Sequence, residues 1–149
     1  TIPDDVMLSI KTFTYNGGGL IGFHDILSTS LSKVFGGIGG VGWHESLNGE
    51  YELIIYDKDH PIVKGIPSKI TILNEEHVYS RCDPKAHNIL NFSFVTKENK
   101  IQTYRAAWTC RFGKGKTFAF MLAHRESTRY NPYIIKMVAN AIRWMKQKE

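Results

Sequence analysis

Two stretches of continuous apolar residues stand out along the chain, and both end in a histidine. Residues 20–24 read LIGFH, and residues 118–124 read FAFMLAH. Apolar residues that are continuous rather than alternating are typical of strands buried on both faces of a sheet. We therefore expect both segments to be interior strands of one sheet.

Two amphipathic segments predict helices that pack on such a sheet. The first begins at Pro3, which suits a first helical turn, and places Val6, Ile10 and Phe13 on one face. The second begins at Asn131, a favourable N-cap, followed by Pro132. Its predicted buried stripe consists of Ile134, Ile135, Val138, Ala141, Ile142 and Met145.

The remaining pattern alternates between short strands and turn signals. Strands are predicted at residues 51–57, 69–73, 87–95 and 101–110, and the last joins residues 116–124 through a glycine-containing hairpin. The segment GGIGGVGWHE, residues 36–45, is too rich in glycine for a helix or central strand and is predicted to be a loop. Helices interspersed with buried strands indicate an α/β fold, and 149 residues form one domain, 1–149.

Composition excludes several classes of protein. No apolar run approaches the roughly 20 residues of a membrane-spanning helix. The net charge of +5 comes from scattered lysines and arginines without the aromatic pattern of an RNA-binding sheet, so we do not expect a nucleic-acid partner. Cys82 and Cys110 form neither a CxxC motif nor a disulfide framework, which favours a reducing, cytoplasmic compartment.

The chemistry-bearing residues gather where the two apolar strands end. His24 is followed by Asp25, and His124 is followed two residues later by Glu126. In open α/β sheets, ligands bind beyond the carboxyl ends of the strands, so the two imidazoles are expected to face one cleft. The alternative is structural, because a histidine at a strand end often satisfies backbone groups at the turn. Both interpretations stay open from the residues alone.

A divalent metal site is a weaker alternative. It would need long-range convergence of His24, His44, His124 and Glu76, and the chain contains no HxH, HExxH or paired cysteines to support it. No cysteine follows a strand-to-helix elbow, so a thiol nucleophile is not expected.

The ordered set of motifs resembles the trehalose-utilisation (ThuA-like) family over nearly the whole chain. The motifs are GGGLIGFH, the glycine-rich segment that ends at His44, DHPIVKGIP, NEEHVY, AAWTCRFGKGKTFAFMLAH and NPYIIKMVANAIRWM. The resemblance implies the class I glutamine amidotransferase-like fold, a flavodoxin-like three-layer α/β sandwich, and a role in disaccharide or keto-sugar metabolism. Family members usually carry a further βαβ portion before the first helix. The resemblance therefore implies an N-terminally incomplete domain, a segment supplied by a separate chain, or a homo-oligomer.

The resemblance also implies a site. In the amidotransferase-like superfamily a Gly-x-Cys elbow carries the nucleophile, and GFH places His24 at the position of that cysteine. The stretch HRE, His124 to Glu126, is similar to the superfamily's His-x-Glu. The implied catalytic residues are His24, His124 and Glu126, without a thiol, so glutamine hydrolysis is not expected. The residues expected to hold a sugar are His44, Glu76, Tyr79 and Trp108.

Two functions follow from this reasoning. One is a sugar-processing enzyme that uses the histidines as general acid and base. The other is a non-catalytic carbohydrate-binding or protein-interaction module of the same fold, because fold alone does not decide between them. No cofactor is identified beyond the weakly supported metal.

Overall fold

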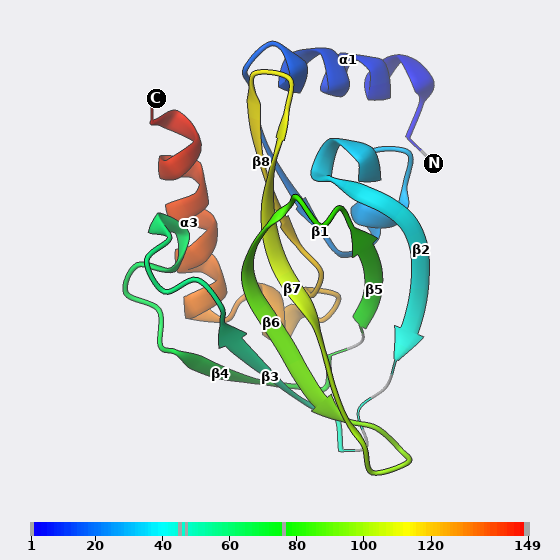
Figure 1. Ribbon diagram of the computed structural model, residues 1–149, viewed down its shortest axis with the longest axis vertical. Coiled ribbons are helices and arrows are strands. Elements are labelled where there is room, and N and C mark those ends of the chain that lie inside the picture. Colours follow the sequence, from blue (N-terminus) through cyan, green and yellow to red (C-terminus); the bar gives the residue numbers. More distant parts are fainter. Residues whose placement is uncertain (1, 45, 47, 76, 148–149) are drawn as a thin grey trace.

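The computed structural model of the protein describes residues 2–44, 46, 48–75 and 77–147 (Figure 1). It is a mixed α/β structure built on a curled sheet of six strands in the order β1-β8-β7-β6-β3-β4. The strands are β1 (Gly19–Phe23), β3 (Glu50–Ile55), β4 (Lys69–Leu73), β6 (His87–Val95), β7 (Ile101–Phe112) and β8 (Gly115–Phe120). The predicted α/β class and the predicted strands of this sheet are confirmed.

The direction of the strands differs from the expected flavodoxin-like sheet. β1 and β8 are parallel, whereas the other neighbouring pairs of this sheet are antiparallel. The reason is local: β7 and β8 are joined by a tight hairpin, with Gly113 at φ +60°, and hairpins produce antiparallel pairs. β8 is an interior strand as predicted, but β1 ends the strand order of this sheet.

The glycine-rich segment predicted as a loop is instead a strand. β2 (Gly37–His44) pairs with β5 (His77–Cys82) in a separate antiparallel sheet of two strands. The register shifts between Gly37 and Gly39 and again between Gly39 and Val41. Glycine is common at such bulges, so the same residues that argued against a strand accommodate its irregularities.

Helices flank the six-stranded sheet. They are α1 (Asp4–Tyr15), the short α2 (Glu126–Arg129) and α3 (Pro132–Lys146), with 3-10 turns η1 (His24–Ser28), η2 (Ser32–Phe35) and η3 (Pro61–Val63). Asn131 caps α3 as predicted, because its side chain accepts a hydrogen bond from the Tyr133 N–H at 3.0 Å. The predicted stripe of α3 is partly wrong: Ile134 and Ala141 are buried, but Ile135 and Ile142 are exposed, and Met137 is buried instead. No helix in the described ranges is both long and apolar enough to cross a membrane.

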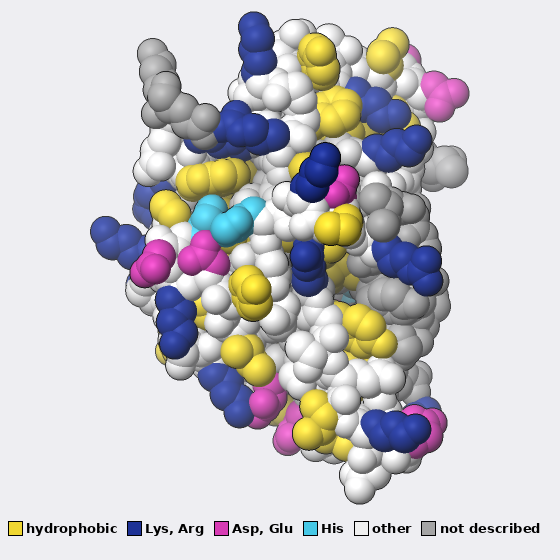
Figure 2. All heavy atoms as spheres, viewed as in Figure 1, with side chains coloured by type: hydrophobic (Ala, Val, Ile, Leu, Met, Phe, Trp, Pro, Cys, Tyr) yellow, Lys and Arg dark blue, Asp and Glu magenta, His cyan; other side chains and the backbone are white. Residues whose placement is uncertain are grey.

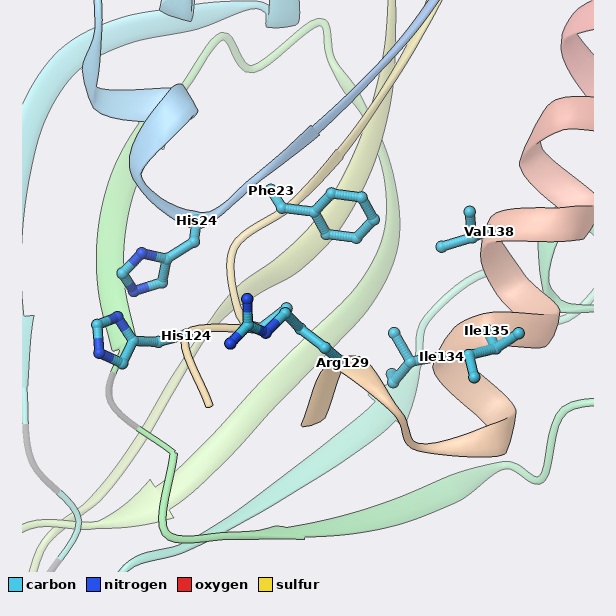
Figure 3. A pocket seen from close by; sticks show the side chains of 8 residues that line it. Phe23, His24, His124, Arg129, Ile134, Ile135 and Val138 are labelled. Atoms are coloured by element: carbon cyan, nitrogen blue, oxygen red, sulfur yellow. The ribbon is translucent and has the colours of Figure 1, made fainter. Parts of the chain in front are cut away.

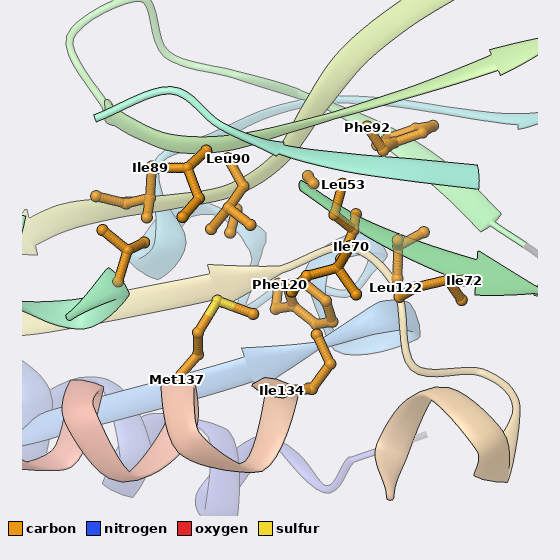
Figure 4. Close-up of a cluster of buried hydrophobic side chains, with 14 of the residues drawn as sticks. Leu53, Ile70, Ile72, Ile89, Leu90, Phe92, Phe120, Leu122, Ile134 and Met137 are labelled. Atoms are coloured by element: carbon orange, nitrogen blue, oxygen red, sulfur yellow. The ribbon is translucent and has the colours of Figure 1, made fainter. Parts of the chain in front are cut away.

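The hydrophobic core lies on both faces of the sheet. Figure 4 shows the larger cluster, where Phe92 and Phe120 of the sheet lie with Ile134 and Met137 of α3. A second cluster on the other face includes Phe35 of η2 and residues that alternate with those of the first cluster. Successive side chains of a strand point to opposite faces, so β8 contributes Phe118 and Phe120 to one cluster and Ala119 to the other. These two clusters hold the carboxyl ends of β1 and β8 in place.

Candidate functional site

The parallel pair β1 and β8 brings His24 and His124 together. The register pairs Phe23 with Phe120, so both strands end at the same edge of the sheet. The ring centroids of His24 and His124 lie 4.8 Å apart, with the ring planes tilted by 51°. Figure 3 shows the two imidazoles side by side at this edge. One ligand can therefore contact both rings.

The backbone at His24 takes a conformation that most residues avoid. His24 has φ +43°, in the left-handed region, where β1 turns directly into η1. Ala123, next to His124, has φ +88°. Non-glycine residues with such values are uncommon, and they concentrate at functional sites where the surrounding structure holds them. Gly22 contributes to this turn, because a Cβ added there would lie 2.5 Å from the Phe35 ring.

A buried carboxylate fixes the backbone of His124. Glu75 is 4% exposed and accepts a hydrogen bond from the His124 N–H at 2.7 Å. It also accepts hydrogen bonds from the Arg125 N–H and the Thr128 hydroxyl. These donors lie at the start of α2, where backbone N–H groups need acceptors. Glu75 therefore positions His124 and α2 together, although it follows β4, far away in the sequence.

The two histidines line a cavity of about 670 Å³. We call it the histidine cavity; its described lining residues are Phe23, His24, Ala123, His124, Arg129, Ile134, Ile135 and Val138. Helix α3 supplies its apolar wall, and Figure 3 shows the Arg129 side chain extending from α2 toward the imidazoles. The volume lies within the range of small-molecule sites, which combine apolar walls with a few polar groups.

The other predicted site residues lie elsewhere or outside the described part of the chain. Trp108 is 1% exposed, packs in the second core cluster and donates its indole N–H to the Phe35 carbonyl at 2.7 Å, so it does not reach the histidine cavity. Glu126 is exposed in α2 and is not among the described lining residues. The backbones of His44 and Tyr79 lie in the β2–β5 sheet, but their side chains are not described, and Glu76 lies outside the described residues.

Sequence reasoning missed two residues of this site. Arg129 follows His124 by five positions, and no motif marks it as a neighbour of His24. Glu75 stands beside Glu76 in the stretch NEEH, and nothing in the local sequence distinguishes the buried carboxylate from its neighbour.

The described groups suit proton transfer better than thiol chemistry. Neutral imidazole carries one N–H donor and one acceptor, so an adjacent pair can accept and donate protons on one ligand. Neither cysteine lines the histidine cavity within the described residues. No group of three histidine, cysteine or carboxylate side chains in the described ranges could hold a metal ion.

Comparison with known proteins gives the following relationships. The ThuA family, described as trehalose utilisation, matches residues 1–145, whereas no curated protein matches the chain. A cytoplasmic protein from Salmonella typhimurium is similar in structure, with TM-score 0.69 and 19% identity, over 99% of this chain and 63% of its own. A ThuA-like protein from Parabacteroides merdae gives TM-score 0.72 and 18% identity, over 100% of this chain and 69% of its own.

A glutamine amidotransferase from Thermotoga maritima is a more distant structural neighbour. It gives TM-score 0.53 and 11% identity, over 97% of this chain and 70% of its own. At this identity the likeness concerns the fold alone. The chain thus spans less than two thirds of the Salmonella protein and about two thirds of the other two.

Proposed function

Because the chain belongs to the ThuA family, described as trehalose utilisation, we propose that it acts in carbohydrate metabolism by binding a sugar in the histidine cavity. The substrate class is a disaccharide or a keto-sugar. The observation that carries the proposal is the pair of imidazoles, 4.8 Å apart in one cavity at the carboxyl ends of two parallel strands.

In the proposed reaction, the two histidines transfer protons to and from the sugar. One imidazole takes a proton from the carbon beside a keto group, the electron pair of that C–H bond forms the carbon–carbon double bond of an enol, and the other imidazole gives a proton to the carbonyl oxygen. The guanidinium of Arg129 stabilises negative charge that develops on that oxygen. Glu75 is a positioning residue, because its contacts are with the backbone of His124 and Arg125 rather than with the cavity.

We also propose that the turn at His24 corresponds to the nucleophile elbow of amidotransferase-like folds. Its support is the positive φ of His24 directly after β1, together with the fold-level likeness to a glutamine amidotransferase. An imidazole in place of a thiol converts the position from nucleophile to acid–base group. Glu126, the third predicted catalytic residue, is exposed two positions after His124, and its role in the reaction stays a prediction.

The test compares turnover and binding of trehalose and a keto-disaccharide by the wild type and by His24→Asn, His124→Gln and a control. Asparagine tolerates positive φ, so His24→Asn removes the imidazole while sparing the turn. The control is His87→Gln, from another pair of neighbouring histidine rings among the described residues. We expect each site variant to lower kcat by roughly 10²–10⁴-fold, and the control to retain activity.

Other outcomes are equally informative. If the wild type binds the sugar without turnover, and both site variants lose this binding, the protein is a carbohydrate-binding module of the same fold and not an enzyme. Binding and turnover that survive both site variants, or the absence of any binding, would refute the proposed site.

A further inference from the structure

A second cavity, of about 620 Å³, lies at the opposite end of α3 from the histidine cavity. We call it the tryptophan cavity; the lining residues that matter here are His60, Lys85, His87, Arg111 and Trp144. They come from the turn before η3, the approach to β6, the start of β6, the end of β7 and the end of α3. Four separate segments thus contribute side chains to one cavity, because Lys85 and His87 belong to the same stretch.

The two histidine rings of this cavity are held by hydrogen bonds and by each other. The rings of His60 and His87 have centroids 5.5 Å apart, and His87 Nε2 lies 2.7 Å from a carboxylate oxygen of Asp57. His60 Nδ1 accepts a hydrogen bond from the Ile62 N–H at 3.2 Å, which leaves Nε2 as the N–H donor of the neutral ring. Burial, and then the nearby His87, lower the pKa of His60, which favours this neutral form.

The charged residues of the described lining are two cations and one carboxylate. Lys85 and Arg111 carry the two cationic side chains, and both residues are exposed. The acidic residue of the lining, Asp83, accepts a hydrogen bond from the Lys85 backbone N–H at 2.8 Å. One oxygen of that carboxylate is thus held by the turn, and the lysine and the arginine together outnumber this carboxylate in the lining. On the face shown in Figure 2, histidine side chains lie beside acidic ones, with lysine or arginine side chains close by.

Trp144 supplies a fixed aromatic wall. Lys116, 8% exposed, lies with Nζ 5.2 Å from the centre of the indole ring, and it donates hydrogen bonds to the carbonyls of Trp144 and Gln147. The His60 ring lies on the same indole, with centroids 5.3 Å apart. These contacts hold the indole before any ligand arrives, which lowers the entropy cost of binding.

We propose that the tryptophan cavity is a second ligand site, which binds a small organic anion. Lys85 and Arg111 hold its phosphate or carboxylate oxygens, His60 donates a hydrogen bond from Nε2, and the carbon skeleton packs against Trp144. The cavity volume suits a ligand of this size, and charge-assisted hydrogen bonds to an oxyanion are stronger than neutral ones. The site is independent of the histidine cavity and of the reaction proposed there.

The test follows the Trp144 indole N–H and the His60 ring by NMR during titration with glucose 6-phosphate, gluconate and glucose. Trp144→Phe assigns the indole signal. We expect the two anions, but not glucose, to shift both signals. The anion with the lower dissociation constant shows whether phosphate or carboxylate is the preferred group. In Lys85→Gln/Arg111→Gln the dissociation constant should rise about tenfold or more.

The matched control is Lys97→Gln/Lys100→Gln, which removes the same charge from the turn between β6 and β7, at the far end of the sheet (Figure 1). It should bind as the wild type does. The single variant Lys85→Gln, at an exposed residue, repeats the test with less risk to folding. The proposal fails if no probe shifts either signal, if glucose shifts them as strongly as the anions, or if the control variant loses binding equally.

Discussion

Glu75 is the residue on which the backbone of the histidine cavity most directly depends. Its carboxylate is buried and accepts hydrogen bonds from two backbone N–H groups and one hydroxyl. A buried acceptor of this kind is stabilising only while its donors remain, and the donors lose their partner when it is removed. A substitution of Glu75 should therefore also destabilise the backbone at His124 and Arg125, whose N–H groups lose their acceptor.

We predict that Glu75→Gln lowers the free energy of unfolding by roughly 1–3 kcal/mol, because one charged acceptor and its geometry are lost. The matched control is Glu126→Gln, the same chemical change at an exposed position nearby, which should change stability by less than about 0.5 kcal/mol. Urea denaturation measures both. Equal effects of the two variants would contradict the positioning role of Glu75.

The pair formed by Asp57 and His87 gives a prediction about pH. The hydrogen bond from His87 is the largest cause that lowers the pKa of Asp57, and the charge of His60 contributes less. Because the pKa is depressed in the folded state, the pair stabilises the fold above the ordinary pKa of an aspartate. That contribution disappears as the pH falls through the depressed pKa. Its size is small, since the pair is partly exposed.

We predict that His87→Gln raises the pKa of Asp57 toward its ordinary value, and that His60→Gln raises it less. Carboxyl chemical shifts in an NMR titration measure both effects. Glu98 is an internal reference, because its pKa is lowered chiefly by a hydrogen bond from Thr96, and it should titrate alike in both variants. A larger rise in His60→Gln than in His87→Gln would show that the hydrogen bond is not the main cause.

At the scale of elements, the end of α1 sits directly on the start of β8. A Cβ added at Gly115 would lie 2.1 Å from the Thr14 carbonyl oxygen, and the Lys114 N–H donates to the Tyr15 carbonyl at 2.9 Å. The contact at Gly115 is with backbone, which cannot move aside without moving the helix. Gly18, in the same junction, differs: a Cβ there would meet the ring of Phe13, whose side chain is 59% exposed.

We predict that Gly115→Ala destabilises the protein by roughly 1–3 kcal/mol, as overpacking does, and separates α1 from β8. Gly18→Ala should cost less than about 1 kcal/mol, because the exposed Phe13 ring can rotate away. Thermal or urea unfolding compares the two variants. Equal losses of stability in the two variants would refute the close approach of the α1 backbone to Gly115.

The elements also show which parts of the fold follow from sequence pattern. The continuous apolar runs ending at His24 and His124, the hairpin at Gly113 and the cap at Asn131 are local signals, and the structure has the corresponding elements. β2 was missed because glycines carry no strand propensity, and its pairing with β5 depends on residues about forty positions away. The place of β1 at the end of the strand order has no local signal either.

The residues of the candidate site also fall into those that a local sequence pattern predicts and those that it does not. His24 and His124 are identifiable because each ends a continuous apolar run of the sequence, although β8 itself ends at Phe120, whereas Glu75 and Arg129 join them through contacts that no local pattern marks. Trp108 is a core residue by its burial, and no local pattern shows this, because an indole that packs and one that binds sugar have the same local sequence. The substrate-binding roles predicted for His44, Glu76 and Tyr79 stay predictions.

At the scale of the whole molecule, the same strands carry both core clusters, so neither cluster can form without the sheet. Phe120 faces one cluster, and Trp108 of the neighbouring strand β7 faces the other. A substitution that removes packing on one face of the sheet should therefore destabilise both core clusters. Such coupling is what makes a small domain unfold in a single step.

We predict that Trp108→Phe and Phe120→Leu each lower the stability of one common transition, by roughly 1–3 kcal/mol. The tryptophan variant loses the hydrogen bond to the Phe35 carbonyl as well as packing. Far-UV and near-UV circular dichroism should give coincident unfolding curves in both variants. The exposed control Ile101→Ala should leave the midpoint nearly unchanged, and two separated transitions in either core variant would contradict the coupling.

The parallel pairing of β1 and β8 also determines when the histidine cavity can form during synthesis of the chain. His24 and His124 are separated by 100 positions (124 − 24), and every strand between them is made before β8. At the usual pace of a ribosome, roughly 5–20 residues per second, about 5–20 s pass between the synthesis of the two histidines. During that interval β1 lacks β8, which is its partner among the described strands, and its apolar side chains must be covered by other contacts. Among the described strands β1 pairs only with β8, so the histidine pair can form only after β8 has been made, and α3 follows it to complete the larger core cluster.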